Sequence, residues 1–429
     1  MATEKDVALV DGQAPPRFVP SKRFTLALLV FFAFIVQYSQ RVNLPIGIVC
    51  MVNKTKATSP SSLADGRKSF DISFTTTIKP VPNPIEKGGI FEEKQFNWGE
   101  LQQQVLLGGY WAGYIFTQVP GTLKFLSFVL SDNLLRDVCV SLGGWLATSI
   151  GAKWVYACSL GTSSTATLAL TIMYFMSSTH FILILILRFI IGLAHGVLFP
   201  ATIALWSVWA VPQERSTLAS IGFCGTHLGT SMTMLVGGLL CRYLASGWMY
   251  LFFISGILGF IWLALWISVT ANSPDQHSSI SEHEKTYINR LTGNKGGKRA
   301  MSLSSIPWKK IIQCKPLNAL ILTHISNLFG LFFFLTNLGK IVHQLFLLPA
   351  QLTGYILSFG FFLTLLSSLL SGRSTPSKLK TVIRNILLIR YSNGSSYSSE
   401  RSDIDNIKKD LQFSHIIHTG LMYGVILFL

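Results

Sequence analysis

The sequence predicts an all-α protein that crosses a membrane about eight to nine times. Half of its 429 residues are hydrophobic and only 13% are charged, whereas soluble domains carry about 25% charged residues. Apolar runs long enough to span a bilayer recur along the chain, and polar segments separate them. Six of these runs lie within residues 24–270, so the N-terminal six-helix bundle is expected to be complete.

The predicted spans follow one another in order along the chain. They cover residues 24–52, 105–120, 155–176, 181–211, 218–240, 249–270, 317–335 and 352–370. The fourth span ends at Pro212, just before the charged pair Glu214 and Arg215. Residues 414–429 are apolar again and are expected to form a partial ninth span.

The basic residues lie mainly between the apolar runs and predict the orientation of the protein. The net charge is +16, and the N-terminus (1–23) and the central loop (271–316) are rich in Lys and Arg, so both are expected in the cytosol. The hydrophilic loop 53–99 then lies on the opposite side, where the sequon at Asn53 predicts a glycoprotein. Nucleic-acid or phosphate binding is the alternative explanation of the basic loop, but its GNKGGKR stretch lacks the G-x-x-x-x-G-K-[ST] spacing.

The cysteines indicate neither a metal site nor a cofactor. They are Cys50, Cys139, Cys158, Cys224, Cys241 and Cys314. No CxxC motif and no mixed Cys/His spacing occurs, so the sequence predicts free thiols. An H-E-x-x-H motif, paired carboxylates within the spans and a Ser/His/Asp set on compatible spans are also missing, so no catalytic residue and no enzyme is predicted.

An arginine inside the fourth apolar run is the most informative residue. Placing Arg188 near the middle of a bilayer costs about 2.5–3.5 kcal/mol, a cost that is tolerated when the side chain faces a water-filled cavity or a partner. Gly192, His195 and Gly196 follow at helical spacings, so the four residues share one face. Two interpretations stay open: this face lines a path for an anion, or it is a buried polar pair that fixes helix packing.

Five stretches of the sequence resemble a known family. They are QRVNLPIGIVCMVN (40–53), GYIFTQVPG (113–121), GGWLATSIGAK (143–153), RFIIGLAHGVLFPA (188–201) and WAVPQERS (209–216). Their order and spacing resemble the sialin, vesicular glutamate transporter and sodium–phosphate cotransporter family of the major facilitator superfamily, over roughly residues 24–372. The resemblance implies a major facilitator fold of two six-helix halves and a secondary active transporter that works by alternating access.

The resemblance also implies where a substrate binds. In this family an arginine of the first span and one of the fourth are implicated in binding the substrate anion, and they correspond to Arg41 and Arg188. A guanidinium group stays charged, and it binds two oxygens of a carboxylate or phosphate at once. The alternative is that each arginine has a structural role only and donates hydrogen bonds to backbone carbonyls of neighbouring helices. The expected partners are a small anionic solute (sialate, glutamate, urate or phosphate) and the lipid bilayer, without nucleic acid.

The coupling residues of the family are replaced in this chain. Sialin-like members have acidic residues at the positions of Ile191 and His195, and the glutamate carriers have a histidine at that of Leu107. Symport with protons through a buried carboxylate is therefore not predicted, and sodium or voltage coupling stays open. His195 either titrates in place of the carboxylate or is a neutral histidine packed between helices. Tyr110 is a further candidate for proton coupling or for lining the cavity.

Other candidates lie in the seventh span and near the cytosolic face. His324 and Asn327, three residues apart, share one helix face and either line the cavity from the second half or are satisfied within the bundle. The residues expected to brace the cytosolic gate are Gly144, Lys153, Glu214 and Arg215.

Two breaks interrupt the resemblance. Removing residues 122–143 restores the continuous motif QVPGGWLATSIGAK, so this segment is expected to be an insertion, either a retained intron or alternative exon or a lineage-specific loop. The resemblance fades after Gly372, which leaves 317–372 as a partial second bundle and 373–429 as a divergent tail. The chain is thus either a transporter or a truncated isoform that does not transport. Lysosomal, vesicular and plasma membranes all stay open, and no oligomeric state is predicted.

Overall fold

A computed structural model shows a bundle of helices. It describes residues 16–52, 96–118, 142–172, 181–292 and 352–366, with single positions at 175, at 313 and between 322 and 337. These described segments are almost entirely helical, and the isolated bridge between Val52 and Phe96 is the one β interaction found in them. The predicted all-α fold class is confirmed.

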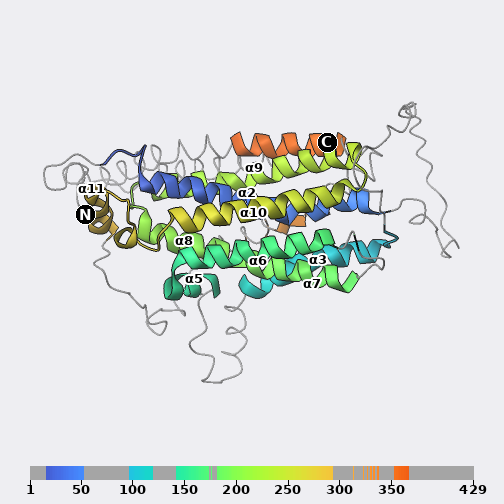
Figure 1. Ribbon diagram of the computed structural model, residues 1–429, viewed down its shortest axis with the longest axis horizontal. Helices are drawn as coiled ribbons and strands as arrows, with labels where there is room; N and C mark the ends of the chain where they lie inside the picture. Colours follow the sequence, from blue (N-terminus) through green and yellow to red (C-terminus); the bar gives the residue numbers. More distant parts are fainter. Residues whose placement is uncertain are drawn as a thin grey trace, which may run out of the picture.

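The long helices run side by side along the longest axis of the molecule (Figure 1). They are α2 (Lys22–Met51), α3 (Glu100–Gln118), α6 (Ala152–Ile172), α7 (Phe181–Gly196), α8 (Leu198–Trp209), α9 (Arg215–Tyr243) and α10 (Gly247–Val269). In the part of the chain that the structure describes, three stretches are long and apolar enough to cross a membrane: α2, α7 continued by α8, and α10. A shorter apolar helix, Leu352–Leu366, lies beside α9 (Figure 1).

Helix α2 packs along α9 and also contacts α10. Gly225 of α9 permits this close approach, because a Cβ atom there would overlap the carbonyl oxygen of Phe31. Pro45 lies inside α2. Because proline has no N–H, the helical hydrogen bond to the carbonyl of Arg41 cannot form. The backbone hydrogen bonds of α2 are therefore interrupted at Arg41, one of the two arginines predicted to bind an anion.

The fourth predicted span is divided into α7 and α8 at Val197. Pro200, in the first turn of α8, lacks the N–H group that would bond to the carbonyl of Gly196. The interruption directly follows the polar face of α7. All four residues predicted to share that face, Arg188, Gly192, His195 and Gly196, are buried, and the prediction of a single face is confirmed.

At one end of the bundle, three segments meet at Arg23. Its fully buried guanidinium pairs with Glu214 and, at 3.1 Å, with Glu284, and it lies 5.1 Å from the ring centre of Tyr287. The last two residues belong to α11 (Glu282–Thr292), which follows the short helix η4 (Pro274–Gln276) in the basic central loop. The N-terminal flank and the central loop thus lie at the same end, as the positive-inside prediction requires.

The same end holds the segment α5 (Leu142–Leu146) and η3 (Ala147–Gly151) before α6. Gly151 has φ +94°, and a Cβ atom there would overlap the side chain of Asn272. Lys153 donates from Nζ to the carbonyls of Ile267 (2.9 Å) and Thr270 (2.6 Å) at the end of α10. This positive charge lies at the negative end of the helix dipole, so Lys153 stabilises the last turn of α10.

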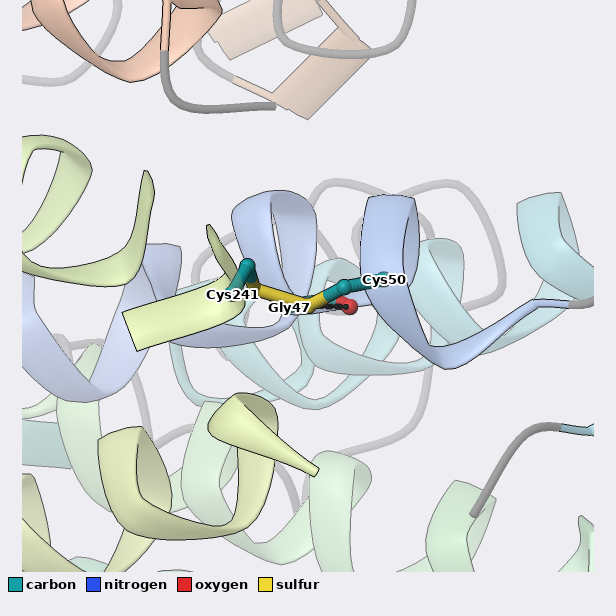
Figure 2. Close-up of a disulfide and its surroundings, with 3 residues drawn as sticks. All are labelled: Gly47, Cys50 and Cys241. Carbon is teal, nitrogen blue, oxygen red and sulfur yellow. Dashed lines mark hydrogen bonds between the residues drawn. A yellow bond between two sulfur atoms is a disulfide. The ribbon is translucent and has the colours of Figure 1, made fainter. Parts of the chain in front are cut away.

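At the opposite end, a disulfide between Cys50 and Cys241 joins α2 to α9, with Cα atoms 5.9 Å apart (Figure 2). The prediction of free thiols is therefore wrong for this pair. The two cysteines are 191 residues apart in sequence, and only the packing of α2 against α9 brings them together. Cys158 and Cys224 are free, as predicted, and Cys139 and Cys314 lie outside the described residues. Disulfides persist in oxidising compartments, which fits a non-cytosolic position of this end.

Candidate functional site

Arg41 of α2 and Arg188 of α7 line one common pocket. Apolar residues of α2 and α3, including Leu107, form much of its wall, and Thr336, the residue after the seventh predicted span, also lines it. Among the described residues that line the pocket, none is acidic. The two arginines that the sequence singles out are therefore brought together around a single space.

Close packing of α3 against α7 brings the side chains of this pocket together. A Cβ atom at Gly192 of α7 would overlap the carbonyl oxygen of Tyr110, and one at Gly113 of α3 would overlap that of Phe189. Contacts of this kind need small residues on both helices. The glycines beside Arg188 and His195 thus allow the aromatic side chains of α3 to reach both polar residues.

Aromatic rings surround the guanidinium of Arg41. They belong to Tyr38, Tyr110, Trp111, Tyr114 and Phe332, with ring centres between 4.7 and 5.2 Å from Cζ. Nε of Arg41 donates to the hydroxyl of Tyr110 at 2.7 Å, but Nη1 and Nη2 have no hydrogen-bond partner among the described residues. Ring faces attract a cation without satisfying its N–H donors. Both terminal nitrogens of this buried group, each with two N–H donors, therefore lack an acceptor among the described residues.

Arg188 is held more firmly by its neighbours. Nη1 donates to the carbonyl of Gln40 at 3.2 Å, and Nη2 donates to Oδ1 of Asn43 at 2.8 Å. Its guanidinium carbon lies 5.4 Å from the ring centre of Phe252. Nε has no partner within the described part of the chain. Both acceptors are neutral, so the positive charge of Arg188 is not cancelled by them.

The hydroxyl of Tyr110 connects Arg41 to His195. It accepts from Arg41 and lies 3.2 Å from Nδ1 of His195. A tyrosine hydroxyl has one proton, which is free for Nδ1 because Arg41 supplies its own. If Tyr110 donates to Nδ1, a neutral His195 carries its proton on Nε2, an atom with no hydrogen-bond partner among the described residues. The sequence names both residues as candidates, and the structure shows the contact between them.

The second half of the chain contributes residues that the sequence analysis missed. Trp111 of α3 donates from Nε1 to Oγ1 of Thr336 at 3.0 Å and packs against Phe332, with ring centres 4.5 Å apart. Phe332 and Thr336 are four residues apart and so share one helix face, which is the signal that would have found them. The predicted cavity residues His324 and Asn327 lie outside the described residues.

Two positions at which the resemblance implies coupling residues in relatives are apolar and buried. Ile191 is completely buried in α7, and Leu107 is buried in the pocket wall. Neither side chain can carry a proton or a hydrogen bond. The polar side chains that line the pocket include those of the two arginines, Tyr110 and Thr336, and His195 contacts Tyr110.

The candidate gate residues lie at the end of the bundle that holds Arg23, which is the predicted cytosolic end, apart from the pocket lining. Glu214 precedes α9 and pairs with Arg23, and Arg215 donates to the carbonyl of Ala210 at 3.4 Å. Burial raises the pKa of the Glu214 carboxyl, while the charge of Arg23 acts in the opposite direction. Gly144 lies in α5. The predicted glycosylation site Asn53 lies outside the described residues.

A metal centre is not found in the described segments. No three His, Cys, Asp or Glu side chains there lie close enough together to hold a metal ion. The polar chemistry of the pocket is that of guanidinium, hydroxyl and imidazole groups. Such groups bind anions through charge and hydrogen bonds.

Comparisons with known proteins agree on one family. A family model described as Major Facilitator Superfamily matches residues 138–392. Sialin of Homo sapiens is 32% identical over 83% of this chain and 64% of its own length, and sialin of Ovis aries is 31% identical over 85% and 66%. Vesicular glutamate transporter 1 of Xenopus laevis is 29% identical over 71% of this chain and 44% of that protein. The chain thus spans about two thirds of the length of the sialins that it matches.

Proposed function

Because the chain belongs to the major facilitator superfamily, we propose that it is a secondary active transporter of organic anions or inorganic phosphate. The family match covers more than half of the chain, which is a multi-pass integral membrane protein. The proposal of an anion as cargo rests on one observation: two buried guanidinium groups line a common pocket that has no acidic residue among its described lining.

The charges of the pocket favour an anion over a neutral or cationic solute. Arginine remains protonated in proteins, and an uncompensated buried charge is unfavourable. An entering carboxylate or phosphate compensates this charge. It also accepts from N–H groups of the three nitrogens that lack a described partner, Nη1 and Nη2 of Arg41 and Nε of Arg188. A neutral solute provides only the hydrogen bonds, and a cation is repelled.

Four anions are candidates for the transported solute. One relative is named for glutamate transport, and sialate, urate and phosphate each present oxygens that a guanidinium fork binds. We propose that one of these four anions is the solute, and that the protein works in a vesicular, lysosomal or plasma membrane. Function as an enzyme is not part of the proposal.

Coupling to a proton, sodium or voltage gradient drives the proposed transport. If the gradient is one of protons, we propose that His195 is the group that binds the coupled proton. Its imidazole contacts Tyr110 and lies near the charges of Arg41 and Arg188. An anion in the pocket offsets the two guanidinium charges and makes protonation of the imidazole less unfavourable. Binding of the anion and of the proton then favour each other reciprocally.

Uptake by proteoliposomes tests the function. The purified protein is reconstituted, and uptake of labelled sialate, glutamate, urate and phosphate is measured under imposed proton, sodium and potassium-diffusion gradients. We expect gradient-driven uptake of at least one anion, and a loss of at least about tenfold in Arg41→Ala and Arg188→Ala, since each removes a charge-assisted contact. Arg242→Ala is the control, because this arginine near the end of α9 lies outside the pocket.

Two outcomes would contradict the proposal. Uptake that is absent for all four anions under every gradient would exclude the stated cargo. Uptake that is unchanged in both pocket variants would exclude the assigned site. Substitution His195→Asn separates the coupling modes, because it should abolish proton-driven uptake and leave exchange of anion across the membrane without a gradient intact.

A further inference from the structure

A chain of hydrogen bonds leads from α10 through α2 to the guanidinium of Arg188. The hydroxyl of Ser255 donates to the carbonyl of Phe252 at 3.0 Å. Nδ2 of Asn43 donates to the hydroxyl oxygen of Ser255 at 3.2 Å, and Oδ1 of Asn43 accepts from Nη2 of Arg188 at 2.8 Å. Three helices, α10, α2 and α7, are thereby joined at one polar contact.

The bonding pattern fixes the orientation of the Asn43 amide. The single proton of the Ser255 hydroxyl is used by the Phe252 carbonyl, so its oxygen is left to accept from the amide nitrogen of Asn43. The amide oxygen must then face Arg188. Asn43 is fully buried, and Ser255 and Arg188 are each 1% exposed, so water does not offer an alternative partner.

A neutral acceptor at this position has a specific electrostatic effect. A carboxylate in place of the amide would hold the same nitrogen of Arg188, but it would also cancel the positive charge of the guanidinium. The carbonyl of Gln40, the second partner of Arg188, is likewise uncharged. Arg188 is thus oriented by two groups that leave its charge in place.

We propose that Asn43 is a positioning residue that holds Arg188 in its ligand-binding orientation while keeping the pocket positively charged. This inference rests on the proposed function, since it assigns to Asn43 a part in binding the anion through Arg188. Ser255 supports Asn43 by fixing which end of the amide faces the guanidinium. Because the guanidinium of Arg188 is already held in place, less conformational entropy is lost when an anion binds.

Substitution Asn43→Asp tests the proposal, because it changes one amide nitrogen to oxygen and leaves the size of the side chain unchanged. Uptake of the anion that the unmodified protein transports fastest, out of labelled sialate, glutamate, urate and phosphate, is measured in proteoliposomes. We expect KM to rise at least about tenfold while the maximal rate changes little, because the new carboxylate competes with the anion for Arg188. Asn272→Asp is the control, since Asn272 lies beyond the end of α10, outside the pocket, and accepts from the backbone of Lys153.

Two comparisons separate this inference from the proposed function. If Arg188→Lys raises KM and Asn43→Asp does not, the positioning role is overturned and the anion site stands. If neither substitution changes KM, the assignment of Arg188 to anion binding fails as well. An equal rise of KM in Asn272→Asp would also overturn the positioning role, because it would reveal a general effect of replacing an amide by a carboxylate.

A second variant applies if Asn43→Asp does not give folded protein. Ser255→Ala leaves Asn43 and Arg188 intact but removes the hydroxyl that orients the amide. We expect a smaller rise of KM, about threefold, which corresponds to part of one hydrogen bond. An unchanged KM in folded Ser255→Ala protein would overturn the proposal.

Discussion

At the residue scale, the two pocket arginines differ in how much of their bonding capacity is used. Arg188 has two protein acceptors, whereas Arg41 has one, the hydroxyl of Tyr110. Rings on several sides restrict the position of the Arg41 guanidinium without occupying its terminal nitrogens. Arg41 is therefore the group that a ligand reaches with the fewest lost protein contacts, and Tyr110 is the residue that orients it.

Removing the hydroxyl of Tyr110 should weaken anion uptake. In Tyr110→Phe the ring remains beside Arg41, but Nε of Arg41 and Nδ1 of His195 both lose their partner. We expect KM to rise about fivefold, the equivalent of about 1 kcal/mol for one hydrogen bond. The measurement is the concentration dependence of uptake into proteoliposomes.

Tyr156→Phe is the control for this substitution. Its buried hydroxyl contacts Thr202 and not the pocket, so a general cost of losing a buried hydroxyl would appear in both variants. An equal KM for Tyr110→Phe and the unmodified protein would show that the hydroxyl has no part in orienting Arg41.

The pH dependence of stability should include a contribution from His277, which lies outside the spans. Nδ1 accepts from the backbone N–H of Ser279, and Nε2 lies 3.1 Å from the carbonyl of Val269. Burial and, second, the charge of Lys22 lower the pKa of His277. Its stabilising contribution is therefore complete above the unfolded pKa of about 6.5 and is lost as the pH falls through the lower folded pKa.

Thermal unfolding in detergent measures this contribution. The melting temperature of the unmodified protein should fall between about pH 7.5 and pH 5.5, and His277→Gln should reduce this fall. The exposed His283 of α11 provides the control, His283→Gln. An identical fall in His277→Gln and in the unmodified protein would contradict the prediction.

The sequence predicts some of these residues and cannot predict others. Arg41 and Arg188 are found because charged residues are rare in apolar spans. The roles inferred here for Asn43 and Thr336 depend on which helices meet, since neither residue type is unusual at its position. The site roles of the arginines remain predictions until uptake is measured.

At the scale of the elements, the contact between α3 and α7 determines whether the pocket exists. Because the glycines on both helices have no side chain, the two backbones can approach each other closely. The polar residues of the pocket come from the same turns as these glycines. Separation of the two helices would therefore disrupt the contact of Tyr110 with His195.

Gly192→Ala should separate the two helices. A Cβ atom at Gly192 overlaps the carbonyl oxygen of Tyr110, whereas one at Gly108, on the other face of α3, meets nothing within 4 Å in the described structure. We expect Gly192→Ala to destabilise the protein by about 1–3 kcal/mol through overpacking and to reduce uptake. Gly108→Ala should leave both properties unchanged or raise the melting temperature slightly. Equal melting temperatures for the two variants would contradict this account.

Hydropathy predicts most of the described helices, because most of them coincide with long apolar runs of the sequence. It does not predict the break between α7 and α8, although Pro200 marks it, since the apolar composition continues across the break. The short helices α5 and η3 are also missed. Their positions follow from contacts with Val197 and Asn272, which lie far from them in sequence.

At the scale of the whole molecule, one covalent bond fixes how α2 and α9 move. The Cys50–Cys241 disulfide closes a loop of the chain with a sequence separation of 191 residues, which a spacing argument from the sequence alone does not reveal. Removing it by Cys50→Ser should lower the free energy of unfolding by about 2–5 kcal/mol. The measurement is the melting temperature in detergent, where addition of dithiothreitol should lower the value of the unmodified protein but not that of the variant.

Mass spectrometry provides an independent check of the bond. Digestion without reductant should release one linked peptide that contains Cys50 and Cys241, and reduction should divide it. Cys224→Ser is the control, because Cys224 is a free buried thiol in α9. Recovery of Cys50 and Cys241 only as unlinked peptides would contradict the structure.

The bond also constrains conformational change. Helix α2 carries Arg41 and Asn43, and α9 contacts the other half through Ser231 and Ser358, whose hydroxyls lie 2.9 Å apart. The disulfide and the long packing contact between α2 and α9 limit sliding of one helix along the other. We therefore expect displacement of α9 in the proposed transport cycle to displace Arg41 as well. Movement of the second half at the contact between Ser231 and Ser358 would then displace α9 and, through the disulfide, the part of α2 that carries Arg41.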